Sequence, residues 1–168
     1  RNGAEVPDTN FGPVGRVLHL DNGAWAEVTA VGDLPNDRSA GPPPDPSSVE
    51  AFTVETWLSP SQAPSCQASV VHEQAAGGGV AWRLSLSPEL RPEAEVRTAS
   101  GTVMVAATPS TMPSPLVAGR FAHVSMTHDS RAGVLSLSGM GVEVARSAAP
   151  RGERVVAAGA SLVVGGTE

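Results

Sequence analysis

The sequence contains no lysine, no tyrosine and only one cysteine among its 168 residues. Aromatic residues make up 4% of the chain, so a hydrophobic core has to be built mainly from Val, Leu and Ala. Cys66 has no second cysteine to pair with, and we interpret it as a small, half-buried apolar side chain. No apolar run reaches the roughly eighteen residues of a transmembrane helix. This sequence therefore predicts neither a disulfide framework nor a helical membrane span.

Basic residues are few and scattered along the chain. All eleven are arginine, against seventeen acidic residues, which gives a formal net charge of −6. Proteins that bind nucleic acids or anionic membranes gather their basic side chains into patches. We therefore predict no nucleic-acid partner and no membrane insertion. The exclusive use of arginine indicates the coding bias of a GC-rich genome, and we expect a bacterial source.

Glycine (18 residues) and proline (15 residues) divide the chain into short runs rich in Val, Leu and Thr. Apolar and polar residues alternate in many of these runs, which is typical of antiparallel strands with one buried face. We predict an all-β fold in which two antiparallel sheets pack as a sandwich. The predicted strands are residues 15–20, 25–31, 52–58, 67–73, 80–86, 93–98, 103–107, 121–127, 134–138, 142–145 and 160–164.

The strands are predicted to form one domain, residues 15–168, preceded by a polar arm at residues 1–14. The proline-rich segment 41–46 has the composition of a linker between domains. Only about forty residues precede it, too few for a core of their own. We therefore interpret this segment as a surface loop inside a single domain.

The strand at 52–58 predicts a candidate binding surface. Phe52 and Val54 point to one side, whereas Glu55 and Trp57 point to the other. An aromatic ring beside a carboxylate can bind a sugar, because the ring stacks on C–H groups and the acid accepts hydroxyl hydrogen bonds. We expect His123 to lie on the equivalent face of its own strand. The alternative is structural, with Trp57 packed under a loop and Glu55 paired with an arginine.

Five short strings in a fixed order resemble the laminin-G-like domains of the concanavalin A-like lectin/glucanase jelly-roll family. Phe121 stands where that family often has tryptophan, and His128 where it usually has tyrosine. The strings are Leu-His-Leu-Asp-Asn-Gly (18–23), Phe-Thr-Val-Glu-Thr-Trp-Leu-Ser-Pro (52–60), Gly-Arg-Phe-Ala-His-Val-Ser-Met-Thr-His-Asp (119–129), the hairpin 135–145 and Leu-Val-Val-Gly-Gly (162–166).

The resemblance implies a noncatalytic recognition or adhesion module that is secreted or at the cell surface and binds carbohydrate or a protein partner. It also implies calcium held by loops. Asp21 and Asn22, with Asp33, Asn36 or Asp37, offer the hard oxygen ligands that calcium prefers. The alternative is that Asn22-Gly23 is a plain hairpin turn, which needs no metal.

A glycoside hydrolase is the third reading of the family resemblance. Glu93 and Glu95 share one face of a strand, about 6.5–7 Å apart, which is within range for a glycosidase pair. Related glucanases carry a Glu-x-Asp-x-x-Glu strand, but here Thr98 occupies the third acidic position. The four histidines show no close pair for zinc. We therefore predict no catalytic residues.

The end of the sequence suggests an alternative role in assembly. The family continues past the Gly-Gly pair with a strand that lies beside the opening strand, whereas this sequence stops at Glu168. If that closing strand is absent, the strand at 16–20 has an open edge that can pair with a neighbouring subunit or domain. The alternative function is therefore a structural subunit of a surface or filament protein.

Overall fold

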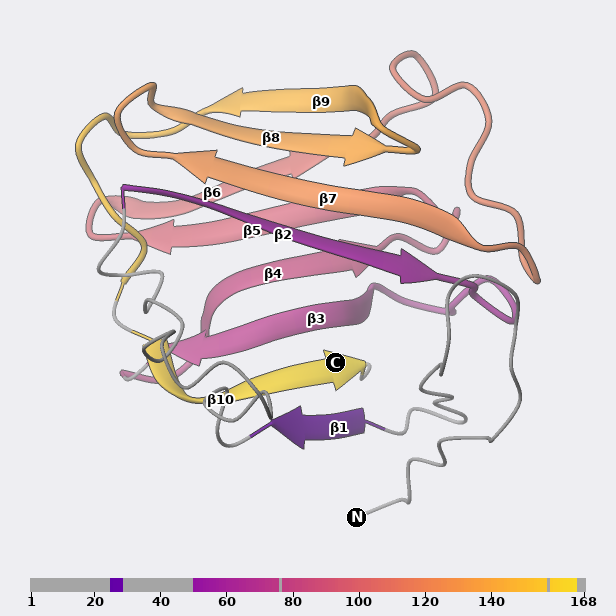
Figure 1. Cartoon of the computed structure of the whole chain (residues 1–168), viewed down its shortest axis with the longest axis horizontal. Coiled ribbons are helices and arrows are strands. Elements are labelled where there is room, and N and C mark those ends of the chain that lie inside the picture. The colour runs from indigo at the N-terminus through magenta and orange to yellow at the C-terminus, as the bar shows by residue number, and fades with distance from the viewer. Residues whose placement is uncertain (1–24, 29–49, 76, 157, 166–168) are drawn as a thin grey trace, which may run out of the picture.

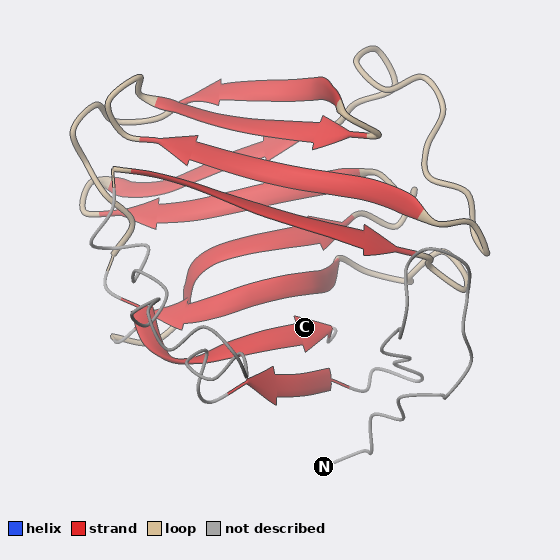
Figure 2. Ribbon diagram, viewed as in Figure 1, coloured by secondary structure: helices blue, strands red, loops and turns tan. Residues whose placement is uncertain are grey.

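The computed structural model describes residues 25–28, 50–75, 77–156 and 158–165, and every regular element in them is a strand (Figure 2). The all-β prediction is confirmed, and the described residues include no helix that could span a membrane. The strands are β1 (Trp25–Val28), β2 (Ala51–Leu58), β3 (Ala68–Ala75), β4 (Val80–Leu86), β5 (Pro92–Thr98), β6 (Gly101–Ala106), β7 (Ala122–Asp129), β8 (Val134–Gly139), β9 (Val142–Ala148) and β10 (Ala158–Gly165).

The strands form two antiparallel sheets that pack face to face (Figure 1). The larger sheet has the order β1-β10-β3-β4-β5-β6, and the smaller has the order β2-β7-β8-β9. Strands β5 and β6 of the first sheet contact β8 and β9 of the second. This is the predicted jelly-roll sandwich, in which each strand lends one face to the space between the sheets.

The observed strands differ from the predicted ones mainly at their ends. Strand β6 begins at Gly101, two residues early, because the hairpin closes by pairing Thr98 with Gly101. Strand β7 extends to Asp129, which pairs with both Ala51 and Val134. The predicted strand at 15–20, the arm at 1–14 and the proline-rich loop at 41–46 lie outside the described residues.

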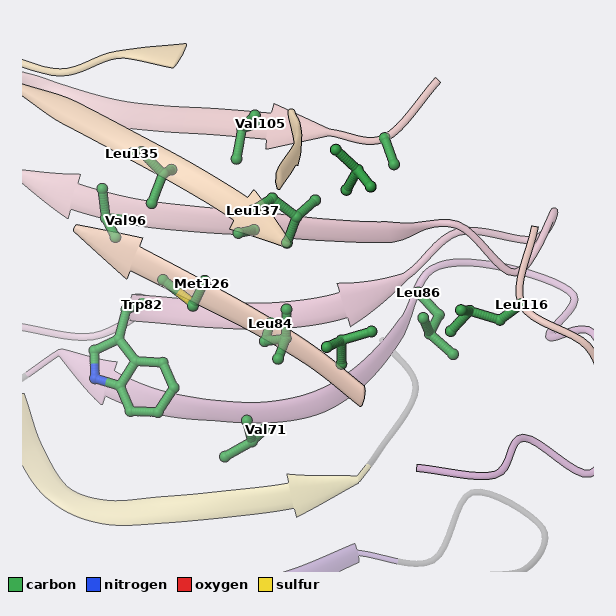
Figure 3. Close-up of a cluster of buried hydrophobic side chains, with 14 of the residues drawn as sticks. Val71, Trp82, Leu84, Leu86, Val96, Val105, Leu116, Met126, Leu135 and Leu137 are labelled. Carbon is green, nitrogen blue, oxygen red and sulfur yellow. The ribbon is translucent and has the colours of Figure 1, made fainter. Parts of the chain in front are cut away.

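The core lies between the sheets and is mostly aliphatic, as the scarcity of aromatic residues requires (Figure 3). Alternate residues of β7 and β8 are fully covered, among them Met126, Leu135 and Leu137. On the larger sheet, the core-facing residues of β4 and β5 belong to the same cluster and include Leu84 and Val96. Burial of such side chains stabilises the fold by about 25 cal/mol for each Å² of apolar surface removed from water, and this is the main favourable term in folding.

Strand β4 corrects the expectation that each strand has one solvent-facing side. Alternation along β4 predicts that Ala81, Arg83 and Ser85, on the face opposite Trp82 and Leu84, face solvent, yet all three are buried. Strand β4 is central in its sheet, and on its outer face Ser85 accepts a hydrogen bond from Gln67 at 3.1 Å. Arg83 bonds Glu95 of β5 at 2.6 Å. A half-buried polar layer therefore lies on the outside of the larger sheet.

Candidate functional site

The outer face of the smaller sheet carries the predicted binding residues. Along β2, Phe52, Val54 and Leu58 pack against the core. On the opposite face, Thr53, Glu55 and Trp57 are exposed. The Trp57 side chain is 53% exposed. The alternative in which Trp57 packs under a loop is therefore wrong, because the pleat of β2 turns this ring away from the core.

Strand pairing brings the three predicted residues together. Trp57 lies directly opposite His123 of β7, and their ring centroids are 5.3 Å apart with a 54° tilt. The His123 Nε2 atom lies 3.5 Å from a carboxylate oxygen of Glu55. Glu55 therefore faces a histidine rather than an arginine. The Glu55 side chain is 69% exposed, so it can accept further hydrogen bonds from a ligand.

The turn between β8 and β9 completes a depression that the sequence did not predict. Trp57, His123, Met140 and Gly141 line it, and it is shallow and open, with a volume of about 310 Å³. Met140 donates its backbone N–H to the His123 carbonyl at 2.8 Å. The His123 N–H in turn approaches Met140 Sδ at 3.3 Å. These contacts fix the methionine beside the Trp57–His123 pair.

Met140 adopts a backbone conformation that few non-glycine residues take. Its φ is +53° and that of Gly141 is +79°. Because Gly139 pairs with Val142, these two residues form a two-residue hairpin turn with positive φ at both positions. Met140 is also 57% exposed. An exposed methionine in a left-handed conformation at the rim of a depression is a candidate ligand contact.

The rest of this face is rich in hydroxyl groups. Strand register places Thr53 beside Thr127, and their hydroxyl oxygens are 2.8 Å apart. Ser125 lies between Glu55 on β2 and Ser138 on β8. The sequence did not identify these hydroxyl groups as site residues, because a Ser or Thr on the exposed face of an alternating strand does not by itself indicate a function. The register of the sheet gathers them beside the depression.

Charges on this face are mostly acidic or already paired. Arg146 of β9 donates two hydrogen bonds to Glu143, at 2.9 and 2.6 Å. Hydrogen bonding to Arg146 lowers the pKa of the Glu143 carboxyl, which stays ionised. The four residues that line the depression include no arginine.

The two carboxylates weighed as a glycosidase pair lie on the other sheet. Glu93 and Glu95 do share the outer face of β5, but both have protein partners. Glu93 accepts a hydrogen bond from Gln67, and Glu95 accepts one from Arg83. Thr98, at the third position, is buried and donates its hydroxyl to the Gly101 carbonyl. These contacts give the two carboxylates a structural role in the polar layer over β4.

The predicted calcium ligands Asp21 and Asn22 lie outside the described residues, as do Asp33, Asn36 and Asp37. Within the described ranges, no group of three or more His, Cys, Asp or Glu residues is placed to hold a metal ion. The half-buried interpretation of Cys66 is wrong, because this side chain is exposed in the segment before β3.

Comparisons with known proteins agree with this fold. The family model described as the concanavalin A-like lectin/glucanases superfamily matches residues 36–168. A search of the curated proteins gave no match. Among solved structures, a heptameric SAP-like pentraxin from Limulus polyphemus is 14% identical with a TM-score of 0.52, covering 69% of this chain and 52% of that one.

Two further similar structures come from Bacteroides ovatus and Ruminococcus gnavus. A putative carbohydrate binding protein from Bacteroides ovatus is 15% identical with a TM-score of 0.51, covering 68% of this chain and 30% of that one. The CBM40 domain of the Ruminococcus gnavus IT-sialidase, solved with alpha2,3 sialyllactose, is 12% identical with a TM-score of 0.56, covering 70% of this chain and 64% of that one. The alignments thus span from 30% to 64% of these three chains, and such low identities show the fold alone.

Proposed function

The chain belongs to the concanavalin A-like lectin/glucanase superfamily, and we propose that it is a noncatalytic carbohydrate-binding module. The observation that carries this proposal is the exposed Trp57 ring, held beside His123 and Glu55 on the outer face of the smaller sheet. The similar Bacteroides protein is described as a putative carbohydrate binding protein, and the similar sialidase module was solved with sialyllactose, which supports this class of ligand.

The depression suits one sugar ring that lies against Trp57. Sugars present C–H groups on one face, and these stack on an indole ring, while hydroxyls at the rim need hydrogen-bond partners. Glu55 and His123 supply such partners at one side of the ring. Met140 supplies an apolar wall at the other side. Further sugar units would continue over the hydroxyl groups of Ser125 and its neighbours.

The charges favour a neutral sugar over an acidic one. A sugar carboxylate is best held by an arginine that can donate two parallel hydrogen bonds. Arg146 already makes such a pair with Glu143, and the exposed Glu55 carboxylate stands at the depression itself. A sialylated ligand such as the one named for the Ruminococcus module would meet repulsion here.

The proposal is tested by a glycan array followed by calorimetric titration of the best ligand. Trp57→Ala is expected to lower the affinity at least tenfold, whereas Trp57→Phe keeps a stacking ring and retains most of it. Met104→Ala is the matched control, because Met104 is 55% exposed but lies on the other sheet. Equal affinities for Trp57→Ala and the native chain would overturn the site, and an array without any bound glycan would overturn the function.

Calcium binding by Asp21 and Asn22 and a secreted or cell-surface location belong to the same proposal. The family resemblance implies loops that hold calcium and a secreted or cell-surface protein. Calcium stabilises a folded protein only if it binds the native state, by mass action. A melting temperature that is the same in calcium and in EDTA would argue against the metal site and leave the sugar site untouched.

A further inference from the structure

Polarity changes along the outer face of the smaller sheet, from one end of its strands to the other. On β2 the outward residues run from Thr53 through Glu55 to the exposed Trp57 ring. On the antiparallel strand β7, His123 lies opposite Trp57 and Ser125 lies opposite Glu55. The part of this face away from Trp57 therefore offers hydroxyl and carboxylate groups, whereas its end offers an aromatic ring.

The end of the sheet at Trp57 gathers further apolar side chains. Strand β2 ends there, β7 begins there, and the turn between β8 and β9 lies at the same end (Figure 1). Phe121 directly precedes β7, and the alternation of that strand places its side chain on the outer face with His123. Of the large apolar side chains that are exposed in the described residues, all except Met104 belong to this end: Trp57, Val117, Phe121, Met140 and Val142. Exposed apolar groups gathered in one place mark a binding surface.

The polar atoms of Met140, which forms one wall of the depression, are already used within the protein. Met140 donates its backbone N–H to the His123 carbonyl at 2.8 Å. Its Sδ atom, a weak acceptor, receives the His123 N–H at 3.3 Å. A sugar hydroxyl turned toward this wall would lose water partners without gaining protein ones, which lowers affinity. A methyl group in the same place would instead gain from burial.

We propose that the ligand of this site is a 6-deoxyhexose, a sugar with a methyl group on C5 where an ordinary hexose has a hydroxymethyl group. This inference rests on the proposed carbohydrate-binding function and names the class of sugar. The ring lies on Trp57 with its hydroxyls turned toward Glu55 and Ser125, and its methyl group lies against Met140 and Phe121. A 6-deoxyhexose is neutral, polar along one edge and apolar at the other, as is the face that would bind it.

The preference follows from the one group that differs between a 6-deoxyhexose and its parent hexose. The methyl group is removed from water, and the hydroxyl that would lack a partner is absent. The depression is shallow and open, so a bound C6 group keeps part of its contact with water. Together these effects predict that the deoxy sugar binds about tenfold more tightly than the parent hexose.

Matched pairs of sugars test this inference without any change to the protein. L-Fucose and L-galactose differ in the C6 hydroxyl alone, as do L-rhamnose and L-mannose. Each sugar is titrated as its methyl α-glycoside into the native chain, and the dissociation constants are read from the NMR signals of the Trp57 indole and the Met140 backbone. At least one pair is expected to bind, with the deoxy sugar about tenfold tighter. Equal affinities within each pair, a preference for the hydroxymethyl sugar, or no shift with all four sugars would overturn the inference.

The glycan array distinguishes failure of this inference from failure of the proposed function. If the array binds glycans but the four sugars give no deoxy preference, the class of sugar is wrong and carbohydrate binding stands. If no glycan binds at all, both proposals fall.

A variant at the wall of the depression tests where the methyl group lies. Met140→Gln keeps the length of the side chain and adds an amide that can pair with a C6 hydroxyl. It is expected to reduce the preference for the deoxy sugar from about tenfold to less than about threefold. Met104→Gln is the matched control, because Met104 is similarly exposed on the other sheet, and it should leave the preference unchanged. A tenfold preference that survives Met140→Gln would overturn the placement of the methyl group against Met140.

Discussion

Met140→Asn is expected to act in opposite directions on stability and on sugar binding. Met140 is the first residue of a two-residue turn with φ of +53°. Left-handed backbone costs most residues roughly 1–2 kcal/mol, and asparagine tolerates it much better. The substitution also creates the Asn-Gly pair that suits this kind of turn. The turn should therefore gain about 1 kcal/mol from its backbone.

The loss of methionine packing offsets part of that gain. A fully buried methionine contributes about 1.5–3 kcal/mol, but Met140 is 57% exposed and keeps less than half of that contact. The net change in the free energy of unfolding is expected to lie between zero and a gain of about 1 kcal/mol, or up to a few degrees in melting temperature. Sugar affinity should fall about fivefold, since the apolar wall of the depression is lost.

Urea unfolding and calorimetric titration of the same preparation measure the two effects. Gly141→Ala isolates backbone strain, because a Cβ there meets no atom within 4 Å at a φ of +79°. That variant is expected to lose about 1 kcal/mol of stability. If Met140→Asn lost more than about 1 kcal/mol and bound sugar as tightly as the native chain, Met140 would be a packing residue and not part of the site.

Three further outcomes are expected. Burial lowers the pKa of His128 below 6.5, with Asp129 opposing the shift, so the unfolded state takes up the proton first and stability falls as pH drops from 6.5 toward the folded-state pKa. His128→Phe should remove that part of the pH dependence in unfolding curves measured between pH 7 and pH 5. Leu137→Ala, at a fully buried position, should cost about 2–5 kcal/mol in urea unfolding. Asp21→Ala should abolish any rise in melting temperature caused by calcium, and a rise that survives would move the metal elsewhere.

Most of the fold could be predicted because its strands carry a clear alternation. In β2, alternate apolar residues mark the buried face, and in β7 the buried set includes Val124 and Met126. Strand β4 was harder, since a central strand covered on both faces buries polar residues such as Arg83 that alternation assigns to solvent. Burial there depends on neighbouring strands, which a single run of residues does not reveal.

The candidate site could be predicted only in part. Glu55 and Trp57 lie two residues apart on one strand, so their shared face follows from the pleat alone. Their contact with His123 depends on the register between β2 and β7. Met140 lies beside them because it occupies a two-residue turn with left-handed backbone geometry. That geometry was not predictable, because the sequence has neither asparagine nor glycine at this position. Cys66 shows the same limit, since its exposure depends on how its loop folds.

Nuclear magnetic resonance of the three tryptophan indole N–H groups tests the central claim most directly. The chain has Trp25, Trp57 and Trp82. Of the two tryptophan side chains that the structure describes, Trp57 lines the proposed sugar site, and Trp82 is buried with its N–H on Glu73. Titration with the best neutral glycan is expected to shift the Trp57 signal and the backbone signals of His123 and Met140, and to leave Trp82 unchanged. Shifts confined to the outer face of the larger sheet, around Glu93 and Glu95, would contradict the assignment of the binding face.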